Sequence, residues 1–225
     1  MSKDFSSVKA IFFDTGDTLY TSDEMEKAYP QKLTECIAKG KGLTHEEAKK
    51  LIEDTTDKLK GTVRHITKVR VAAELGFARA RIHEAFCTVN PKDFLNKDPG
   101  LDLVMARLAQ KYKLGIISNF KRSHIIEILN ALGLSSEWFP LLVTEDIVTE
   151  VKPDPEPFLK AIKLSGYMPN ECLYVGDSPT KDMWPAKEVG MMTVLVAQNP
   201  TSEEMKYADA SIPDVKAIVE LLGVS

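Results

Sequence analysis

Two hydrophobic patterns follow one another along the chain. Short continuous apolar runs predict buried strands, the first of which ends at Phe13 and the second of which covers 114–118. Between them, apolar residues recur at helical spacing and predict four helices, over about 21–40, 44–61, 62–75 and 78–89. Beyond residue 96 helices alternate with strands, and the remaining strands are predicted near 140–143, 172–175 and 192–196.

This order of elements predicts an α/β protein. Alternating strands and helices form a mostly parallel sheet with helices on both faces, the Rossmann-like, doubly wound arrangement. The helical stretch interrupts that alternation after the first strand, so we expect two domains. Residues 1–20 and 96–225 would form the α/β core, and residues 21–95 an inserted, all-helical domain. The insert leaves from the carboxyl end of a strand, where such sheets bind ligands, so we expect it to act as a lid.

Composition narrows the classes of partner. With 44% hydrophobic and 28% charged residues, the chain has the profile of an ordinary globular protein. A net charge of −4 gives no electrostatic reason to expect nucleic acid or an anionic membrane as a partner. The three cysteines are widely spaced, and neither a signal peptide nor a membrane span is recognisable, so we expect a cytoplasmic protein acting on a small molecule.

Asp14 is the first candidate for a reacting group. It directly follows the first strand and opens the polar stretch Asp-Thr-Gly-Asp-Thr. The same residues are good turn formers, so Asp14 alone would suit a structural turn equally well. An aspartate in this position can serve as a nucleophile toward phosphorus when its charge is balanced by a cation, forming an aspartyl-phosphate.

The other groups that phosphoryl transfer requires also follow strands or open helices. Ser118 and Asn119 follow the second strand and offer donors for phosphate oxygens, although Ser-Asn is common in turns. Lys152 lies among three prolines before a helix, which suggests a fixed position for its charge. Asp177 ends another strand in Gly-Asp, and Asp182 comes five residues later. Such carboxylates suit Mg²⁺, with Asp182 either a ligand or an orienting group.

In this order, the segments resemble the four motifs of the haloacid dehalogenase-like (HAD) superfamily, and the helical insert resembles its C1-type cap. The resemblance implies a Mg²⁺-dependent phosphatase of a small phosphorylated metabolite. Asp14 would be the nucleophile and Lys152 its neutralising cation. The phosphate would be held by Thr18, Ser118, Asn119 and Lys152, and the metal by Asp14, the backbone carbonyl of Gly16, Asp177 and Asp182.

Gly16 departs from the family pattern. A second aspartate usually stands there and acts as general acid and base, a contribution of about 10²–10⁴. Besides a phosphatase with this role moved elsewhere, two alternatives therefore remain open. One is a dehalogenase or phosphonatase type of hydrolase, the latter requiring a Schiff-base lysine in the cap, where the candidates are Lys27, Lys32, Lys49, Lys50, Lys58, Lys60 and Lys68. The other is a weakly catalytic phosphate- or partner-binding module.

Overall fold

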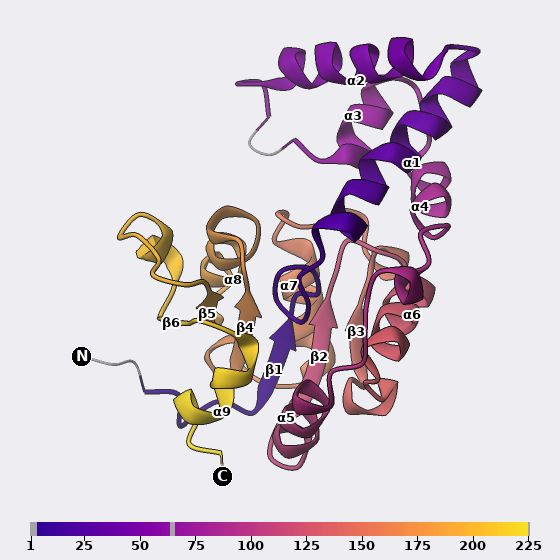
Figure 1. The fold of residues 1–225 in the computed structure, drawn as a ribbon. Helices are drawn as coiled ribbons and strands as arrows, with labels where there is room; N and C mark the ends of the chain where they lie inside the picture. The colour runs from indigo at the N-terminus through magenta and orange to yellow at the C-terminus, as the bar shows by residue number, and fades with distance from the viewer. Residues whose placement is uncertain (1–3, 64–65, 225) are drawn as a thin grey trace. The chain divides into compact units, whose positions relative to one another are not determined.

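The computed structural model describes residues 4–63 and 66–224 and confirms the α/β fold class (Figure 1). Six parallel strands form one sheet in the order β3-β2-β1-β4-β5-β6. The strands are β1 (Ala10–Phe13), β2 (Lys113–Ile117), β3 (Leu141–Val143), β4 (Cys172–Gly176), β5 (Met192–Val196) and β6 (Ala210–Ile212). The sequence analysis did not predict β6, which has three residues and includes exposed Ser211.

The first strand lies in the middle of the sheet, and every one of its side chains is buried. Its last residue, Phe13, is paired with Ile116 of β2 on one side and with Val175 of β4 on the other. Because all three strands run in the same direction, the residues that follow them emerge at the same edge of the sheet. This edge is the one at which α/β sheets bind ligands.

Helices complete the core unit on both faces of the sheet. They are α5 (Pro99–Ala109), α6 (Arg122–Leu132), α7 (Glu156–Ser165), α8 (Trp184–Glu188) and α9 (Ile218–Leu221). On one face, Phe158 of α7 and Ala186 of α8 join a buried cluster with Phe12 and Tyr174. Side chains alternate along a strand, so Phe13 points to the other face, where its ring meets Phe139 edge-on at 6.3 Å.

Residues 22–94 form a separate compact unit of helices, whereas the residues up to Thr21 and from Leu95 onward form the other. The helices are α1 (Asp23–Lys41), α2 (His45–Leu59), α3 (Lys68–Glu74) and α4 (Arg79–Phe86). Thr44 and Glu47 form a capping box that starts α2. Tyr29 of α1 meets Phe86 of α4 edge-on at 5.6 Å, so aromatic packing joins the first and last helices of this unit.

The third helix is shorter than its pattern predicts. Instead of beginning at Thr62, α3 begins at Lys68, because the Thr67 hydroxyl accepts the Arg70 amide at 3.1 Å and caps the helix there. Thr62 belongs to a turn, with its amide donating to the Leu59 carbonyl at 3.0 Å. Residues 64–65 of the predicted helix lie outside the described residues.

Among the described helices, none is both long enough and apolar enough to span a bilayer.

Gly115 tests how tightly the middle of the sheet is packed. A Cβ atom there would lie 2.6 Å from the Leu141 carbonyl oxygen and from the Phe12 ring. We expect Gly115→Ala to lower the free energy of unfolding by about 1–3 kcal/mol, measured by urea denaturation, because the main chain of β3 at Leu141 cannot move away from the added methyl group. Gly166→Ala is the control: its Cβ meets nothing within 4 Å, so only the left-handed backbone (φ 78°) opposes it. Equal stability of Gly115→Ala and wild type would contradict this packing.

Candidate active site

Three site residues emerge side by side from the central strands. Asp14 follows β1, and its amide donates to the Val175 carbonyl of β4 at 2.9 Å. Ser118 follows β2 and donates its amide to the Val143 carbonyl of β3 at 2.9 Å. Asp177 follows β4. The continued sheet hydrogen bonds therefore fix where these polar residues leave the strands.

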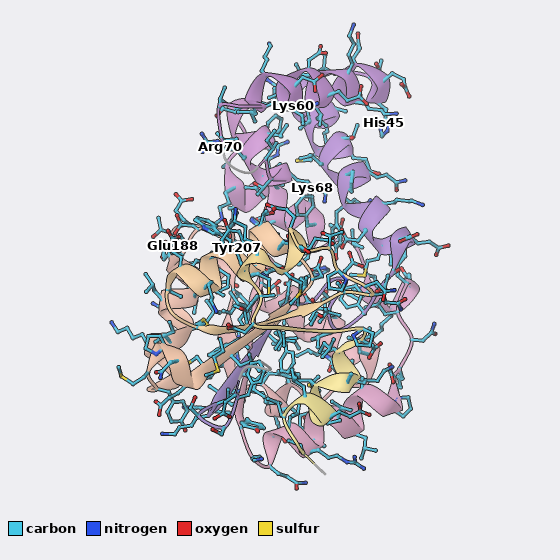
Figure 2. The ribbon with its side chains drawn as sticks, turned by 90° about the vertical axis from the view of Figure 1, so that its left-hand side faces the viewer. His45, Lys60, Lys68, Arg70, Glu188 and Tyr207 are labelled. Carbon is cyan, nitrogen blue, oxygen red and sulfur yellow. The ribbon has the colours of Figure 1, made fainter. Side chains whose placement is uncertain are left out.

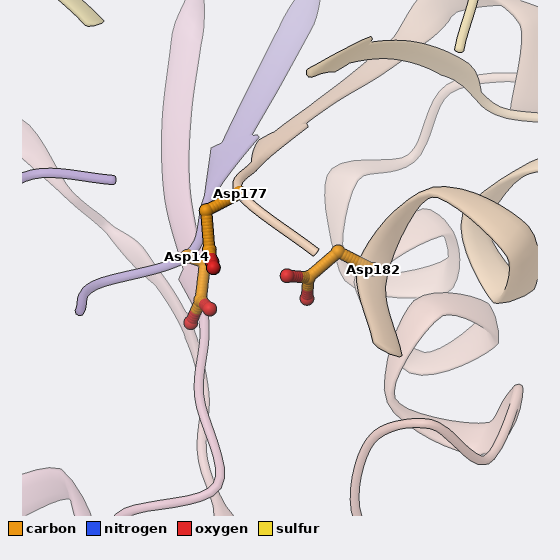
Figure 3. Close-up of side chains that lie close together, drawn as sticks. All are labelled: Asp14, Asp177 and Asp182. Carbon is orange, nitrogen blue, oxygen red and sulfur yellow. The ribbon is translucent and has the colours of Figure 1, made fainter. Parts of the chain in front are cut away.

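Asp14, Asp177 and Asp182 form a cluster of carboxylates (Figure 3). An oxygen atom from each lies within 4.8 Å of an oxygen from the others. Asp182 comes from the helical turn Pro179–Met183, and Gly176 allows its approach, because a Cβ on Gly176 would lie 3.0 Å from the Asp182 side chain. The structure thus brings together the three acidic side chains predicted to bind metal.

The electrostatics of the cluster suit a divalent cation. Burial and the negative charges of Asp182 and Asp14 raise the pKa of Asp177 to about 7. Burial acts in the same direction on Asp14, but the ammonium groups of Lys152 and Lys181 outweigh it and hold the pKa of Asp14 below its usual value. Three hard carboxylates that repel one another form a donor set that fits Mg²⁺.

Lys152 provides the central positive charge. Its side chain is 1% exposed, and Nζ lies 2.8 Å from Asp14 Oδ1, 2.8 Å from Asp182 Oδ1 and 2.7 Å from the Tyr174 hydroxyl. An ammonium group has three protons to donate, and these three acceptors use all of them. A buried charge without such partners would be strongly unfavourable, so Lys152 and the two carboxylates depend on one another for their burial.

Asn119 holds the main chain of this lysine. Its side-chain amide donates to the Lys152 carbonyl at 2.8 Å, and its side-chain oxygen accepts the Lys152 amide at 2.9 Å. These reciprocal bonds tie the end of β2 to the segment before α7. Sequence reasoning assigned Asn119 only a phosphate contact, which stays a prediction, and did not find this connection across 33 residues.

Ser118 and Thr18, the two residues whose hydroxyl groups are predicted to hold phosphate, are both buried. Ser118 Oγ lies 3.4 Å from the Thr15 hydroxyl and 3.4 Å from the Phe120 amide, which are long hydrogen bonds. The Thr18 hydroxyl is buried and has no hydrogen-bond partner within the described part of the chain. A buried polar group in this state is costly unless a ligand satisfies it. Thr18 is therefore a suitable donor for an anion.

Gly16 and Asp17 mark where the usual second carboxylate is replaced. Asp17 has a left-handed backbone (φ 53°), an uncommon conformation for a residue other than glycine. Its side chain is exposed, and it is not a member of the carboxylate cluster formed by the described residues. The geometry therefore gives no support to Asp17 as a substitute for the missing group at Gly16.

Sequence reasoning missed two groups that act on the cluster. The charge of Lys181 helps to lower the pKa of Asp14 and opposes the rise in the pKa of Asp177. Tyr174 lies inside a strand that otherwise consists of core residues, and its hydroxyl bonds both Lys152 and Asp182. A tyrosine in the middle of a fully buried strand was the available signal, because its hydroxyl requires a partner.

The geometry agrees with the comparisons to known proteins. The sequence pattern of the haloacid dehalogenase-like hydrolases matches residues 11–196, so the chain belongs to this family and is a hydrolase. It is 30% identical to a glyceraldehyde 3-phosphate phosphatase of Methanothermobacter thermautotrophicus, covering 95% of this chain and 96% of that protein. It is 37% identical to the pyrophosphatase PpaX of Bacillus cereus, over 47% of each chain.

Solved structures share the fold. A HAD phosphatase from Thermococcus onnurineus superposes with a TM-score of 0.70 at 24% identity, covering 97% of this chain and 99% of that one. A 2-haloacid dehalogenase from Pseudomonas syringae superposes with a TM-score of 0.63 at 20% identity, covering 96% and 98%. Both a phosphatase and a dehalogenase are similar in fold, so the fold alone does not choose between these reactions.

The raised pKa of Asp177 predicts a pH-dependent effect on stability. Between its ordinary pKa of 3.8 and about 7, this carboxyl is protonated in the folded chain and ionised in the unfolded one. Raising the pH through that window therefore destabilises the folded state. In chelator-treated protein we expect Asp177→Asn to raise Tm at pH 8 by about 2–4 °C, which corresponds to about 1 kcal/mol.

Near pH 4 the Tm of the same variant should approach that of wild type, because Asp177 is then protonated in the folded chain and only partly ionised in the unfolded one. Thermal unfolding of both proteins across pH 4–8 provides the measurement. A constant difference in Tm at every pH would show that the substitution acts through packing and not through the charge of Asp177.

Proposed function

We propose that this protein is a Mg²⁺-dependent phosphatase that hydrolyses a small phosphorylated metabolite through an aspartyl-phosphate formed on Asp14. The observation that carries the proposal is the position of Asp14 at the end of β1, in contact with Lys152 at 2.8 Å and clustered with two further carboxylates. The names of the relatives support the same reaction class, because both the glyceraldehyde phosphate enzyme and the pyrophosphatase act on small phosphorylated compounds.

Asp14 would attack phosphorus with Oδ2, since Oδ1 accepts a hydrogen bond from the Lys152 ammonium. The low pKa of Asp14 keeps the nucleophile ionised. Lys152 directs its three protons to Asp14, Asp182 and Tyr174, which supports a role in neutralising the nucleophile. Binding phosphate directly as well would require Lys152 to exchange one of these partners.

The metal would be held by Asp14, Asp177 and the backbone carbonyl of Gly16. When bound, Mg²⁺ would neutralise charge on the phosphoryl oxygens. Asp182 Oδ1 already accepts from Lys152 and Tyr174, and Oδ2 accepts the Ser178 amide at 3.3 Å. These bonds favour an orienting role for Asp182 over direct ligation, the two possibilities that its sequence position left open.

The remaining phosphate oxygens would be bound by hydroxyl groups and by one amide side chain. Thr18 is buried in the turn after β1, Ser118 is buried directly after β2, and Asn119 follows Ser118. We further propose that the helical unit 22–94 serves as a C1-type cap that excludes water, because it is inserted shortly after the strand that carries Asp14. Cys36, Cys87 and Cys172 form no disulfide with one another, which is consistent with a reducing cytoplasm.

A phosphonatase reaction receives no support from the lysines of the helical unit. A Schiff-base lysine is normally activated by desolvation in an apolar pocket. Of the seven candidates, Lys32 is half-buried and bonds Glu35 at 2.9 Å, and the other six are exposed. Lys60, which bonds Asp57 at 2.7 Å, is labelled in Figure 2 with Lys68.

Removing the charge of the nucleophile tests the proposal directly. We expect Asp14→Asn to lower kcat for an aryl phosphate by at least about 10³-fold, because an amide cannot form the covalent intermediate. Steady-state rates with Mg²⁺ give the measurement, and circular dichroism confirms the fold. The matched control is Asp54→Asn on an exposed position of α2, with wild-type rates expected. Substantial turnover by Asp14→Asn would exclude the covalent route.

Gly16 predicts a preference among leaving groups. Without the usual acid at this position, alkyl phosphates, whose leaving group needs a proton, should react far more slowly than aryl or acyl phosphates. We expect Gly16→Asp to raise the alkyl phosphate rate by about 10–100-fold and the aryl rate by much less. Asp17→Asn is the comparison, with little change expected because Asp17 lies outside the carboxylate cluster.

Steady-state rates for one alkyl and one aryl phosphate, measured with wild type, Gly16→Asp and Asp17→Asn, test this expectation. If Asp17→Asn lost most of its alkyl phosphate turnover and Gly16→Asp gained none, the proton transfer would be assigned to Asp17 instead.

A further inference from the structure

Tyr174 presents a hydroxyl group to the site from inside the hydrophobic core. The residue is fully buried in the middle of β4, and its ring belongs to the cluster that contains Phe12 and Phe158. The Phe158 ring meets it edge-on at 5.0 Å with an interplanar angle of 77°. Phenylalanine would supply the same apolar contacts, so packing alone does not explain the hydroxyl.

The chemistry of its neighbours fixes the direction of both hydrogen bonds made by this hydroxyl. An ammonium group can only donate, so the Tyr174 oxygen accepts from Lys152 Nζ at 2.7 Å. The single hydroxyl proton is then donated to Asp182 Oδ1 at 3.0 Å. Lys152 Nζ also bonds Asp182 Oδ1 directly at 2.8 Å, and the three groups form a closed triangle of hydrogen bonds.

This triangle determines where the third proton of the lysine points. Two of the three ammonium protons are bound within it, so the remaining proton is directed at Asp14 Oδ1, 2.8 Å away. Without the hydroxyl, one proton of a fully buried ammonium would lack an acceptor. The lysine would then gain freedom to rotate or shift away from Asp14, since leaving a buried donor without an acceptor is unfavourable.

We propose that Tyr174 is a positioning residue, whose hydroxyl holds the Lys152 ammonium against Asp14 and keeps Asp182 in its orientation. The role in turnover rests on the proposed function of the site, whereas the hold on the ammonium does not. The hydroxyl does not contact the substrate in this arrangement, because both of its bonds are made to protein groups. Its removal should therefore affect kcat and leave KM nearly unchanged.

The test uses Tyr174→Phe, with Tyr112→Phe as the matched control. Tyr112 is also buried but precedes β2, at the opposite end of the strand from Ser118. We expect Tyr174→Phe to lower kcat by about 10–100-fold, the usual effect of losing a group that orients an active-site residue, with KM changed less than about 3-fold. Tyr112→Phe should keep wild-type kcat and KM.

A second readout does not depend on turnover. In protein labelled with ¹⁵N at lysine, the protons of a buried, fully bonded ammonium exchange slowly with water and give an observable signal, which Lys152→Met assigns by its loss. We expect these protons to exchange at least about 3-fold faster in Tyr174→Phe and at the wild-type rate in Tyr112→Phe.

The outcomes separate this inference from the proposed function. Unchanged exchange in Tyr174→Phe would overturn the hold on Lys152, and faster exchange with unchanged kcat would overturn the positioning role. A raised KM at constant kcat would mean that the hydroxyl serves substrate binding instead. A lower Tm with wild-type kcat at 25 °C would indicate a purely structural hydroxyl. Wild-type protein that hydrolyses no phosphate ester would refute the proposed function, and the exchange experiment would still decide whether Tyr174 holds the ammonium.

Discussion

The buried ammonium of Lys152 is the interaction on which the site depends. It is 1% exposed and has three acceptors, two of which are carboxylates. Removing either the lysine or its partners would leave uncompensated charge in the interior, which is much more costly than the pair itself is stabilising. Asp14, Lys152 and Asp182 therefore have to be considered as one unit, and a substitution in one changes the surroundings of the others.

The sheet supplies the precision that this unit requires. Asp14 and Asp177 continue adjacent strands whose residues are paired, so their separation is set by main-chain hydrogen bonds and not by flexible loops. Asn119 adds a second attachment, because it binds both the amide and the carbonyl of Lys152. The main chain of the lysine is thus fixed to the end of β2. Its ammonium is bound by Asp14 directly after β1, by Tyr174 of β4 and by Asp182 of the turn Pro179–Met183.

Negative charge remains in excess around the lysine. The pKa of Asp177 rises to about 7 because burial and two neighbouring carboxylates disfavour its ionised form. The same repulsion that destabilises the cluster would provide affinity for a divalent cation at the proposed metal site. Stability and the proposed function are therefore opposed at this position, as is common where titratable groups are gathered for chemistry.

Much of this protein was predictable from its sequence, because the signals are local. An apolar run that ends in Asp14 and a Gly-Asp pair that ends in Asp177 both identify strands with a polar end, and the periodicity of the helices follows from which faces are buried. The predicted start of α3 was wrong: two threonines, Thr62 and Thr67, could each cap a helix here, and in the structure Thr67 is the cap.

Only the tertiary structure decided the order of the strands in the sheet and the side-chain hydrogen bonds between distant segments. The order of the strands places β1 between β2 and β4, and no local pattern specifies it. The bonds from Asn119 to Lys152 and from Tyr174 to Lys152 span 33 and 22 residues. A sequence shows which residues have donors and acceptors, but a hydrogen bond requires them within about 3 Å, and that distance is set by the packing of the whole core.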